Sequence, residues 1–376
     1  MKTIRVGIIG GGLMGREMAS CFARWCALMD MPVKPVLVAV ADPSDTAREW
    51  FEQQIDGLEY CGPSHVEMLA AAKLDVVYVA VPHQLHEKLY LDVLESGADL
   101  LAEKPFGIDR GAAERIAVAA ESHGAFVRCS SEFPFMPGAQ RAYEHVRDGN
   151  LGRILEVVSG FHHSSDLDSS KTANWKRQSA TCGEIGVLGD LGMHVFHLPL
   201  RLGWRPNRVF AQLQKGFGQR PDGTGGMTAC DTWDNATVHT WQGSGEDSFP
   251  LRFEMKRLVP GETNTWFFEA VGTQGGVRFS TARPKTIEFF DPGKEQAWRS
   301  VDLGFGVPFK TITGGIFEVG FPDVIQQMWA AYLTEREGLL EGRFGCVTPQ
   351  EAVLAQHYYQ AALDSQAGSK VVKMQL

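Results

Sequence analysis

Short apolar runs alternate with segments of helical spacing over the first 150 residues of the chain. The apolar runs are rich in Val and Ile, and they predict strands at residues 4–9, 36–41, 76–81, 98–101 and 126–129. The segments between them predict helices at residues 13–29, 46–54, 65–72, 85–95, 110–122 and 139–147. Because strands that alternate with helices are joined by right-handed crossovers, this pattern predicts a doubly wound parallel sheet covered on both faces. We therefore expect residues 1–150 to form an α/β domain.

A different pattern follows the turn-forming segment Gly149-Asn150-Leu151-Gly152. Longer strands separated by Gly-rich turns are predicted at residues 154–161, 208–213, 236–241, 251–255, 265–271, 276–280 and 286–290. Helices are predicted at residues 187–202, 322–337 and 349–365. Hairpin-sized gaps such as 272–275 favour antiparallel pairing. We therefore expect residues 151–376 to form an α+β domain with a large, mainly antiparallel sheet, whose last helix packs back on the first domain.

The composition narrows the class of protein. The 376 residues are 44% hydrophobic and 22% charged, as in ordinary globular proteins. A total of 36 Lys and Arg against 45 Asp and Glu gives a formal charge of −9, which argues against nucleic acid as the main partner. No apolar run approaches the roughly 20 residues of a membrane helix, and residues 1–12 do not resemble an export signal. The seven cysteines are scattered without a C-x-x-C pair, so we expect no disulfide framework, no structural zinc and a cytoplasmic location.

The first predicted strand runs directly into the segment Gly10-Gly11-Gly12-Leu13-Met14-Gly15, which fits the pattern G-x-G-x-x-G. Gly10 permits a tight turn, Gly12 lets the backbone approach a pyrophosphate, and Gly15 lets the helix pack close to the strand. The N-terminus of the following helix then faces the phosphates with its partial positive charge. The motif stands at the strand-to-helix junction that this mechanism requires, so it predicts a dinucleotide-binding Rossmann domain.

An acidic residue, Asp42, closes the second predicted strand, 27 positions after Gly15. A carboxylate there accepts hydrogen bonds from the adenosine ribose and repels a 2′-phosphate. The expected cofactor is therefore NAD, with NADP disfavoured. The alternative is that Asp42 only caps the next helix.

Three further motifs follow in order along the chain. They are Val79-Ala80-Val81-Pro82-His83-Gln84-Leu85-His86, Ala102-Glu103-Lys104-Pro105-Phe106-Gly107 and Gly189-Asp190-Leu191-Gly192-Met193-His194. Together with the Gly-rich turn, they resemble the glucose-fructose oxidoreductase, inositol dehydrogenase and rhizopine-catabolism dehydrogenase (Gfo/Idh/MocA) family. The resemblance covers most of the chain, and it implies a nucleotide-binding domain, a Glu-Lys-Pro turn after a sheet strand and an antiparallel-sheet substrate domain.

The resemblance also implies the reaction, an NAD-dependent oxidation of a hydroxyl carbon in a sugar, polyol or sugar derivative. It places Lys104 at the substrate hydroxyl beside the nicotinamide, and Asp190 and His194 match the D-x-x-x-H of the family. Their i, i+4 spacing puts both on one helical face. Because alcohol oxidation releases a hydride and a proton, we assign His194 as general base, Lys104 as the cation that stabilises the alkoxide and Asp190 as the orienting group. Lys104 and His194 could exchange these roles.

The resemblance completes the predicted cofactor site, because the family has a His near the nicotinamide at the position of His86. The predicted cofactor-binding residues are Gly10, Gly12, Leu13, Met14, Gly15, Asp42, Pro82, His83, His86, Glu103 and Lys104. No metal is predicted, since neither His pair at i, i+3 has a third ligand at a recognisable spacing.

A polar segment, residues 161–184, separates the first strand of the second domain from the predicted catalytic helix. Its aromatic ring and cations are the groups that bind sugar C–H faces and hydroxyls, although the cations would also suit a carboxylate or sulfonate. Glu132 departs from the family, whose sugar dehydrogenases often have Asn or Arg in this region, and is either a surface acid or a second acid near the sugar. The predicted substrate-binding residues are Lys104, Glu132, His163, Trp175, Lys176, Arg177, Asp190 and His194.

Two other functions stay open at this point. Related oxidoreductive glycosidases oxidise the sugar transiently, eliminate the aglycone and return the hydride, and some replace the Lys and carry a Tyr three positions before the His. Lys104 and Leu191 stand at these positions and favour a dehydrogenase, whereas Glu132 could serve an elimination. The family also includes a non-catalytic nucleotide-binding regulator, against which the intact Lys104, Asp190 and His194 argue. We expect a homodimer or homotetramer, because the outer face of the antiparallel sheet needs a cover.

Overall fold

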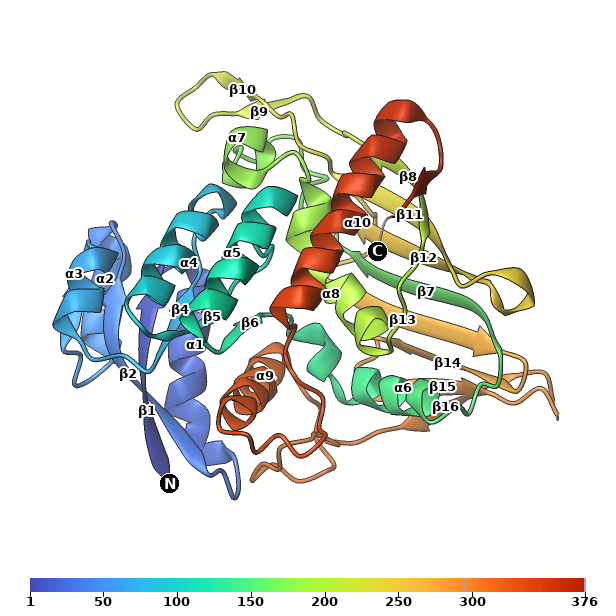
Figure 1. Ribbon diagram of the computed structural model, residues 1–376, viewed down its shortest axis with the longest axis horizontal. Helices are drawn as coiled ribbons and strands as arrows, with labels where there is room; N and C mark the ends of the chain where they lie inside the picture. The colour runs from blue at the N-terminus through green and yellow to red at the C-terminus, as the bar shows by residue number, and fades with distance from the viewer. Residues whose placement is uncertain (294, 375–376) are drawn as a thin grey trace. The chain divides into compact units, whose positions relative to one another are not determined.

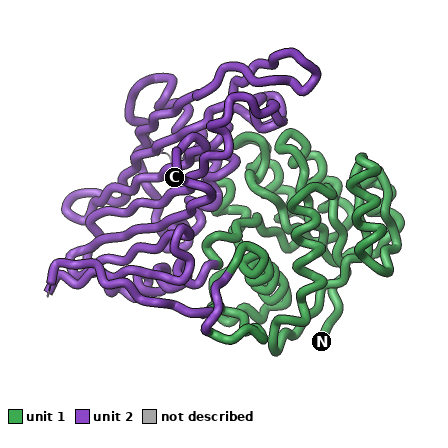
Figure 2. Tube along the Cα trace, turned by 180° about the vertical axis from the view of Figure 1, so that it is seen from behind, with its two compact units in different colours: residues 1–135, 307–315, 320–353 green, residues 136–306, 316–319, 354–376 purple. Residues whose placement is uncertain are grey.

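The chain forms two compact units in a computed structural model that describes residues 1–293 and 295–374 (Figure 1). The first unit comprises residues 1–135, 307–315 and 320–353, and the second comprises residues 136–306, 316–319 and those from 354 onward (Figure 2). The first unit therefore gathers two segments from late in the chain, in addition to the continuous N-terminal part.

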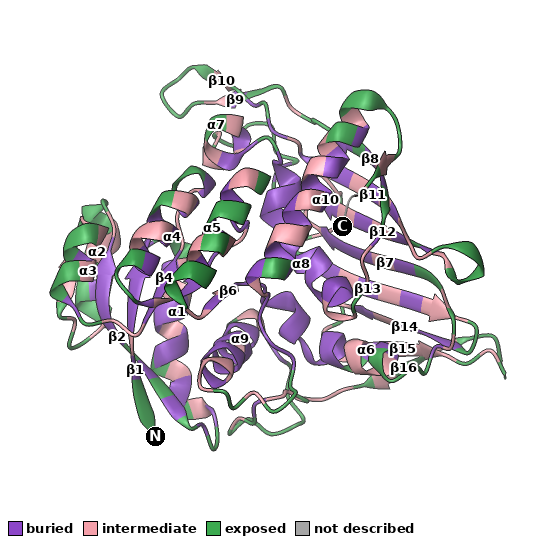
Figure 3. Ribbon diagram, viewed as in Figure 1, coloured by how far each residue is buried: buried purple, intermediate pink, exposed green. Residues whose placement is uncertain are grey.

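The first unit is built on a six-stranded sheet in the order β3-β2-β1-β4-β5-β6, and all its pairs are parallel. The strands are β1 Lys2–Ile9, β2 Val33–Ala41, β3 Tyr60–Gly62, β4 Val76–Val79, β5 Asp99–Ala102 and β6 Val127–Cys129. Val6, Ile8 and Val77 have no exposed surface, as expected for strands covered on both faces. Figure 3 colours strand β4 as buried. The predicted doubly wound parallel sheet is confirmed, although the apolar pattern missed the short strand β3.

The helices of the first unit include one that comes from far along the chain. They are α1 Leu13–Ala23, α2 Asp45–Gln54, α3 His65–Ala71, α4 His86–Glu95, α5 Arg110–His123 and α9 Phe321–Arg336. Helix α9 packs on α1, and the ring of its Trp329 meets the Phe22 ring edge-on with 4.7 Å between centroids. The sequence division places α9 in the second domain, but this contact makes it part of the first unit.

The second unit is built on a nine-stranded sheet in the order β16-β15-β14-β13-β7-β12-β11-β8-β17. The strands are β7 Ile154–His162, β8 Arg208–Gln214, β11 Asn235–Gln242, β12 Phe249–Lys256, β13 Thr265–Gly272, β14 Gly275–Ser280, β15 Thr286–Phe290, β16 Trp298–Asp302 and β17 Val372–Lys373. Strands β7 and β12 pair in parallel, and the other neighbours pair antiparallel, which confirms the mainly antiparallel sheet. A separate hairpin of β9 Gln219–Pro221 and β10 Met227–Ala229 lies inside a segment that the sequence presents as Gly-rich loop.

The helices of the second unit are α6 Pro137–Arg147, α7 Ser179–Cys182, α8 Val187–Arg201 and most of α10 Pro349–Gly368. The packing of the last helix back on the first domain stays a prediction, and the contacts described here for α10 lie within the second unit. Tyr358 of α10 stacks on Phe196 of α8 with 5.5 Å between ring centroids, and Ser365 Oγ accepts a hydrogen bond from the Ala211 N–H on β8. These contacts hold α10 in the second unit.

Candidate active site

The Gly-rich turn lies where strand β1 ends beside strand β4. Gly10 has a φ of +102°, and a Cβ there would lie 2.2 Å from the Ala80 carbonyl oxygen. A Cβ on Gly15 would lie 2.1 Å from the carbonyl oxygen of Gly10. The order of the sheet reverses between β1 and β4, which is where ligands bind in doubly wound folds. The fold itself therefore requires glycine at positions 10 and 15.

Gly12 differs from these two glycines, because a Cβ there would meet no described atom within 4 Å. Its φ of −68° also suits any L-residue, so neither packing nor the backbone demands glycine at this position. Gly12 is the N-cap of α1, and Leu13 and Met14 begin the helix. The first N–H groups of a helix have no acceptor within it, so they are available to a phosphate. The open space over Gly12 fits the pyrophosphate of a dinucleotide.

Asp42 lies beside the same turn and is held by two backbone donors. The N–H of Gly11 donates to Oδ2 at 2.6 Å, and the N–H of Ser44 donates to Oδ1 at 2.8 Å. The cap of α2 is Ser44, whose Oγ accepts from the Ala47 N–H. Asp42 is therefore not the helix cap, and its carboxylate has the position expected of a ribose-binding acid.

The second segment of the predicted cofactor site follows β4 and starts α4. Pro82 is half-buried and precedes His83, which is 2% exposed. His86 is fully buried, with Nδ1 at 2.8 Å from the Pro105 carbonyl oxygen and Nε2 at 2.9 Å from that of Val81. Burial lowers the pKa of His86 against these two contacts. Both ring nitrogens face the backbone, so His86 joins the Glu-Lys-Pro turn to the end of β4.

The third segment is the Glu-Lys-Pro turn after β5. Glu103 points inward, and its Oε1 accepts hydrogen bonds from the Tyr78 hydroxyl at 2.6 Å and the Ser130 hydroxyl at 2.5 Å. Its Oε2 accepts from the N–H of Lys104 at 3.1 Å. The donors come from β4 and from the residue after β6, so Glu103 ties three neighbouring strand ends together. The Lys104 backbone is thereby fixed, while its side chain is half-buried.

Glu132 lies three residues beyond β6 and is only 6% exposed, so it is not a surface acid. Burial and the carboxylate of Glu103 raise its pKa to about 7, against the opposing effect of Lys104. Glu132 thus places a carboxyl that changes charge near neutral pH close to Lys104.

In the second unit, α8 carries both residues of the D-x-x-x-H motif. The helix begins after Gly186, whose φ is +51° and where a Cβ would lie 2.8 Å from the Trp233 backbone nitrogen. Asp190 and His194 follow one turn apart and are 3% and 2% exposed. The His194 carbonyl accepts from the indole N–H of Trp266 at 2.8 Å, and its ring meets that of Phe161 edge-on. The structure confirms the helix and places the two side chains on one buried face.

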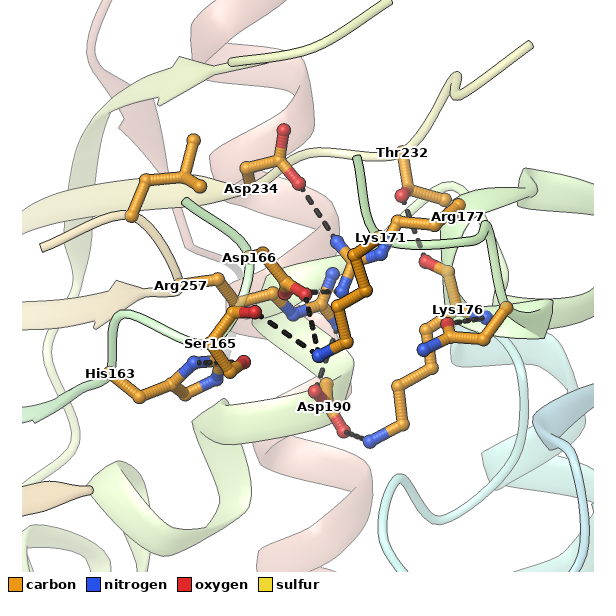
Figure 4. A network of polar contacts seen from close by, with 12 residues as sticks. His163, Ser165, Asp166, Lys171, Lys176, Arg177, Asp190, Thr232, Asp234 and Arg257 are labelled. Atoms are coloured by element: carbon orange, nitrogen blue, oxygen red, sulfur yellow. Dashed lines mark hydrogen bonds and ion pairs between the residues drawn. The ribbon is translucent and has the colours of Figure 1, made fainter. Parts of the chain in front are cut away.

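Two cationic side chains form ion pairs with the carboxylate of Asp190 (Figure 4). Lys176 Nζ lies 2.8 Å from Oδ1, and Arg257 Nη2 lies 2.9 Å from Oδ2. Lys176 belongs to a short 3₁₀ turn, Trp175–Arg177, and its ammonium lies 5.5 Å from the centroid of the Trp175 ring. Asp190 is therefore an ion-paired carboxylate rather than a helix cap.

Arg177, the next residue along, has a structural position. Its guanidinium is buried and pairs with Asp234 at 2.9 Å and with Asp166 (Figure 4). Arg220 is buried as well and donates to the carbonyl oxygens of Asp166 and Asp168. Both arginines stabilise the polar segment from the interior. The contacts described for Arg177 go to carboxylates of the protein, Asp166 and Asp234, rather than toward a substrate.

His163 is half-buried at the start of this segment, and its Nδ1 lies 2.9 Å from Ser165 Oγ. Burial lowers its pKa to about 4, with Asp190 opposing and Arg257 adding to the effect. The imidazole is therefore neutral at physiological pH, and it can accept or donate one hydrogen bond.

No group of three or more metal-ligating side chains occurs in the part of the chain that the structure describes. Within the same residues, the search for membrane-spanning helices found none of sufficient length and apolarity.

Arg257 is the functional candidate that sequence reasoning missed. It follows Lys256 at the end of β12, where the charged residues Glu254 and Lys256 resemble those of an exposed strand end, yet it is completely buried. Tyr78 and Ser130 were missed in the same way, because no local pattern shows that they meet Glu103.

The fold and these sites define a dinucleotide-binding oxidoreductase, and the comparison with protein families agrees. A model described as an oxidoreductase family with an NAD-binding Rossmann fold matches residues 4–131, and the model of the Gfo/Idh/MocA C-terminal domain matches residues 139–278. The chain belongs to the Gfo/Idh/MocA oxidoreductase family. The predictions of the family, of an NAD-dependent enzyme and of NAD as cofactor are confirmed.

The chain is similar to several named proteins. Levoglucosan dehydrogenase of Pseudarthrobacter phenanthrenivorans is 24% identical over 335 residues, which is 82% of each protein. Inositol 2-dehydrogenase 4 of Saccharopolyspora erythraea is 31% identical over 167 residues, 44% of this chain and 47% of the relative. A solved structure of levoglucosan dehydrogenase in complex with NADH and L-sorbose superposes with a TM-score of 0.87 over 99% of both chains, at 21% identity. This superposition establishes the shared fold.

Proposed function

We propose that the protein transfers a hydride between a hydroxyl carbon of a sugar, polyol or sugar derivative and the nicotinamide of NAD. The observation that carries the proposal is the D-x-x-x-H helix, where Asp190 is held as a carboxylate one turn from the buried His194. Relatives that act on an anhydrosugar and on inositol support the choice of substrate class.

Bound NAD supplies the acceptor for the hydride. The residues of this chain would handle the proton and the hydroxyl: as the C–H bond breaks, His194 takes the O–H proton, and a C=O bond forms. Lys104 stabilises the negative charge that develops on the oxygen, and Asp190 accepts a hydrogen bond from a neighbouring hydroxyl. The exchanged assignment, with Lys104 as the base, uses the same groups.

The charges around Asp190 favour a neutral substrate. Lys171, Lys176, Arg177 and Arg257 each pair with a carboxylate of the second unit. A substrate carboxylate or sulfonate would have to compete with these aspartates, whereas sugar hydroxyls can share their remaining acceptor sites. An uncharged carbohydrate is therefore preferred over an anionic one.

The test mixes purified protein and NAD with free sugars, polyols and chromogenic glycosides, and it records NADH formation and aglycone release together. Stoichiometric NADH from a free sugar or polyol is expected. Release of aglycone without net NADH would instead show a redox-cycling glycosidase. Absence of both, with NADH still bound tightly, would favour the nucleotide-binding regulator.

The oligomeric state and the cellular location are part of the same proposal. We propose a homodimer or homotetramer, supported by the outer face of the large sheet, and a cytoplasmic location, supported by the scattered cysteines. Fractionation of the native host and light scattering test these two points.

A further inference from the structure

The carboxylate of Asp190 has two different partners. Lys176 contacts Oδ1 from a surface turn, and its side chain keeps 32% of its surface exposed. Arg257 contacts Oδ2 from the end of β12, and its side chain is 0% exposed. One oxygen thus faces a partly exposed partner, and the other faces a fully buried one; Figure 4 shows both cations beside Asp190.

The Arg257 backbone is itself anchored. Its N–H donates both to Asn235 Oδ1 at 3.1 Å and to the Asp234 carbonyl oxygen at 3.0 Å. Both acceptors lie at the start of the neighbouring strand β11. The side chain is fully buried as well, and a buried guanidinium is strongly favoured to keep a carboxylate partner. The pKa of Arg257 is raised, because the nearby carboxylate of Asp190, with others, outweighs the lowering effect of burial.

We propose that Arg257 is a positioning residue, which holds Oδ2 of Asp190 so that Oδ1 stays aimed at Lys176 and at a substrate hydroxyl. The inference rests on the proposed function, because it assigns how Asp190 meets the substrate. Lys176 is then the exchangeable partner, whose bond to Oδ1 a hydroxyl can share, while Arg257 keeps its bond throughout turnover.

The two cations should therefore differ in their kinetic effects. Lys176→Met is expected to raise KM for the carbohydrate with a smaller change in kcat, because it removes the contact at Oδ1 that a substrate hydroxyl would share. Arg257→Met is expected to lower kcat by about 10- to 100-fold, the range seen when outer partners of functional ligands are lost. Arg257→Lys keeps the charge but not the reach and planar shape of the guanidinium, whose Nη2 makes the contact with Asp190, so we expect partial rescue.

A double-mutant cycle separates positioning from general support of the fold. If Arg257 acts through Asp190, then Arg257→Met in an Asp190→Asn background lowers kcat by less than about threefold. An equal loss in both backgrounds would overturn the proposal. Arg278→Met is the matched control, since it breaks an Arg–Glu pair at 2.7 Å between β14 and β15, which carry no predicted site residue. Its kcat should equal that of the wild type, and NADH fluorescence titration and thermal midpoints identify any variant that has simply unfolded.

A second measurement does not depend on catalysis. It tests the role of Arg257 even if the wild type oxidises no carbohydrate, a result that would contradict only the proposed function. The pKa of His163, followed by NMR of the imidazole-labelled protein, should rise in Arg257→Met, because the guanidinium that disfavours its protonation is gone. It should fall in Asp190→Asn for the opposite reason. An unchanged pKa of His163 in both variants would show that these charges are not held as described, and would overturn the inference whatever the substrate.

Discussion

At the scale of single residues, the site depends on charges that the protein buries and then compensates in different ways. Glu103 is surrounded by hydrogen-bond donors, and Asp190 by cations. Glu132 is buried next to another carboxylate, so its pKa rises to about 7. A compensated carboxylate positions other groups, whereas an acid with a raised pKa exchanges protons near neutral pH.

The position of Lys104 predicts a specific kinetic defect. Lys104→Met keeps the length of the side chain but removes the cation that stabilises the developing alkoxide. We expect kcat/KM for the carbohydrate to fall by about 10²- to 10³-fold, while the Kd for NADH, to which Lys104 is also predicted to contribute, changes by a smaller factor. Steady-state kinetics and fluorescence titration measure the two quantities. Lys88→Met, on the exposed side of α4, serves as control, and retention of more than a tenth of wild-type activity by Lys104→Met would contradict the assignment.

Glu132 predicts a pH dependence of stability. Its pKa is raised in the folded protein, so the folded state binds more protons than the unfolded state between about pH 4.5 and pH 7. The stabilising effect of the protonated acid is present below this window and is lost as the pH rises through it. The difference between the two pKa values corresponds to roughly 3 kcal/mol at most.

Glutamine cannot ionise, so Glu132→Gln removes the free-energy cost of burying the ionised acid. The variant should therefore gain stability relative to the wild type, and the gain should be larger at pH 8 than at pH 5. Thermal midpoints at the two pH values measure the difference, with Glu121→Gln on the exposed face of α5 as control. An equal effect of Glu132→Gln at both pH values would show that Glu132 titrates normally.

At the scale of elements, different glycines of the strand-to-helix turn in the first unit serve the packing of the fold and the binding of the ligand. Position 15 requires glycine because the carbonyl oxygen of Gly10 lies close to it, and a Cβ would be only 2.1 Å from that oxygen. Gly12 faces space that no described atom fills. The same motif therefore contains glycines that the fold requires, Gly10 and Gly15, and one that the ligand requires, Gly12.

This contrast predicts opposite behaviour for two small substitutions. Gly12→Ala should leave the thermal midpoint within about a degree of the wild type and weaken NADH binding at least tenfold, because the added methyl occupies the phosphate position. Gly15→Ala should destabilise the protein by about 1–3 kcal/mol, because the clash lies within the fold. Calorimetry and fluorescence titration give both values. Tight NADH binding by Gly12→Ala would place the pyrophosphate elsewhere.

At the scale of the whole molecule, the large sheet of the second unit leads to a prediction of assembly. The helices α8 and α10 belong to this unit, and the nine-stranded sheet has a second face to cover. We expect a dimer or tetramer, so multi-angle light scattering should report a mass about two or four times 41.4 kDa. A mass equal to that of one chain at micromolar concentration would refute this expectation.

The sequence by itself determined the features that rest on local patterns. Alternating strands and helices predict a parallel sheet, because the connections leave few other topologies. The G-x-G-x-x-G turn was identified for the same reason, since its geometry follows from its own residues, whereas the D-x-x-x-H motif on the predicted helix came from the family resemblance. The family resemblance linked these segments into one function.

Only the tertiary structure decided which distant residues meet. Arg257 lies 67 positions after Asp190, and no periodicity connects them. The burial of Glu132, the structural use of Arg177 and the docking of α9 on α1 also depend on surfaces that exist only after the chain has folded. Short strands such as β3 and β17 are stabilised by their neighbours rather than by their own composition. Hydrophobic spacing encodes elements, whereas the compensation of buried charge is settled by whichever side chains the packed elements bring within hydrogen-bonding distance.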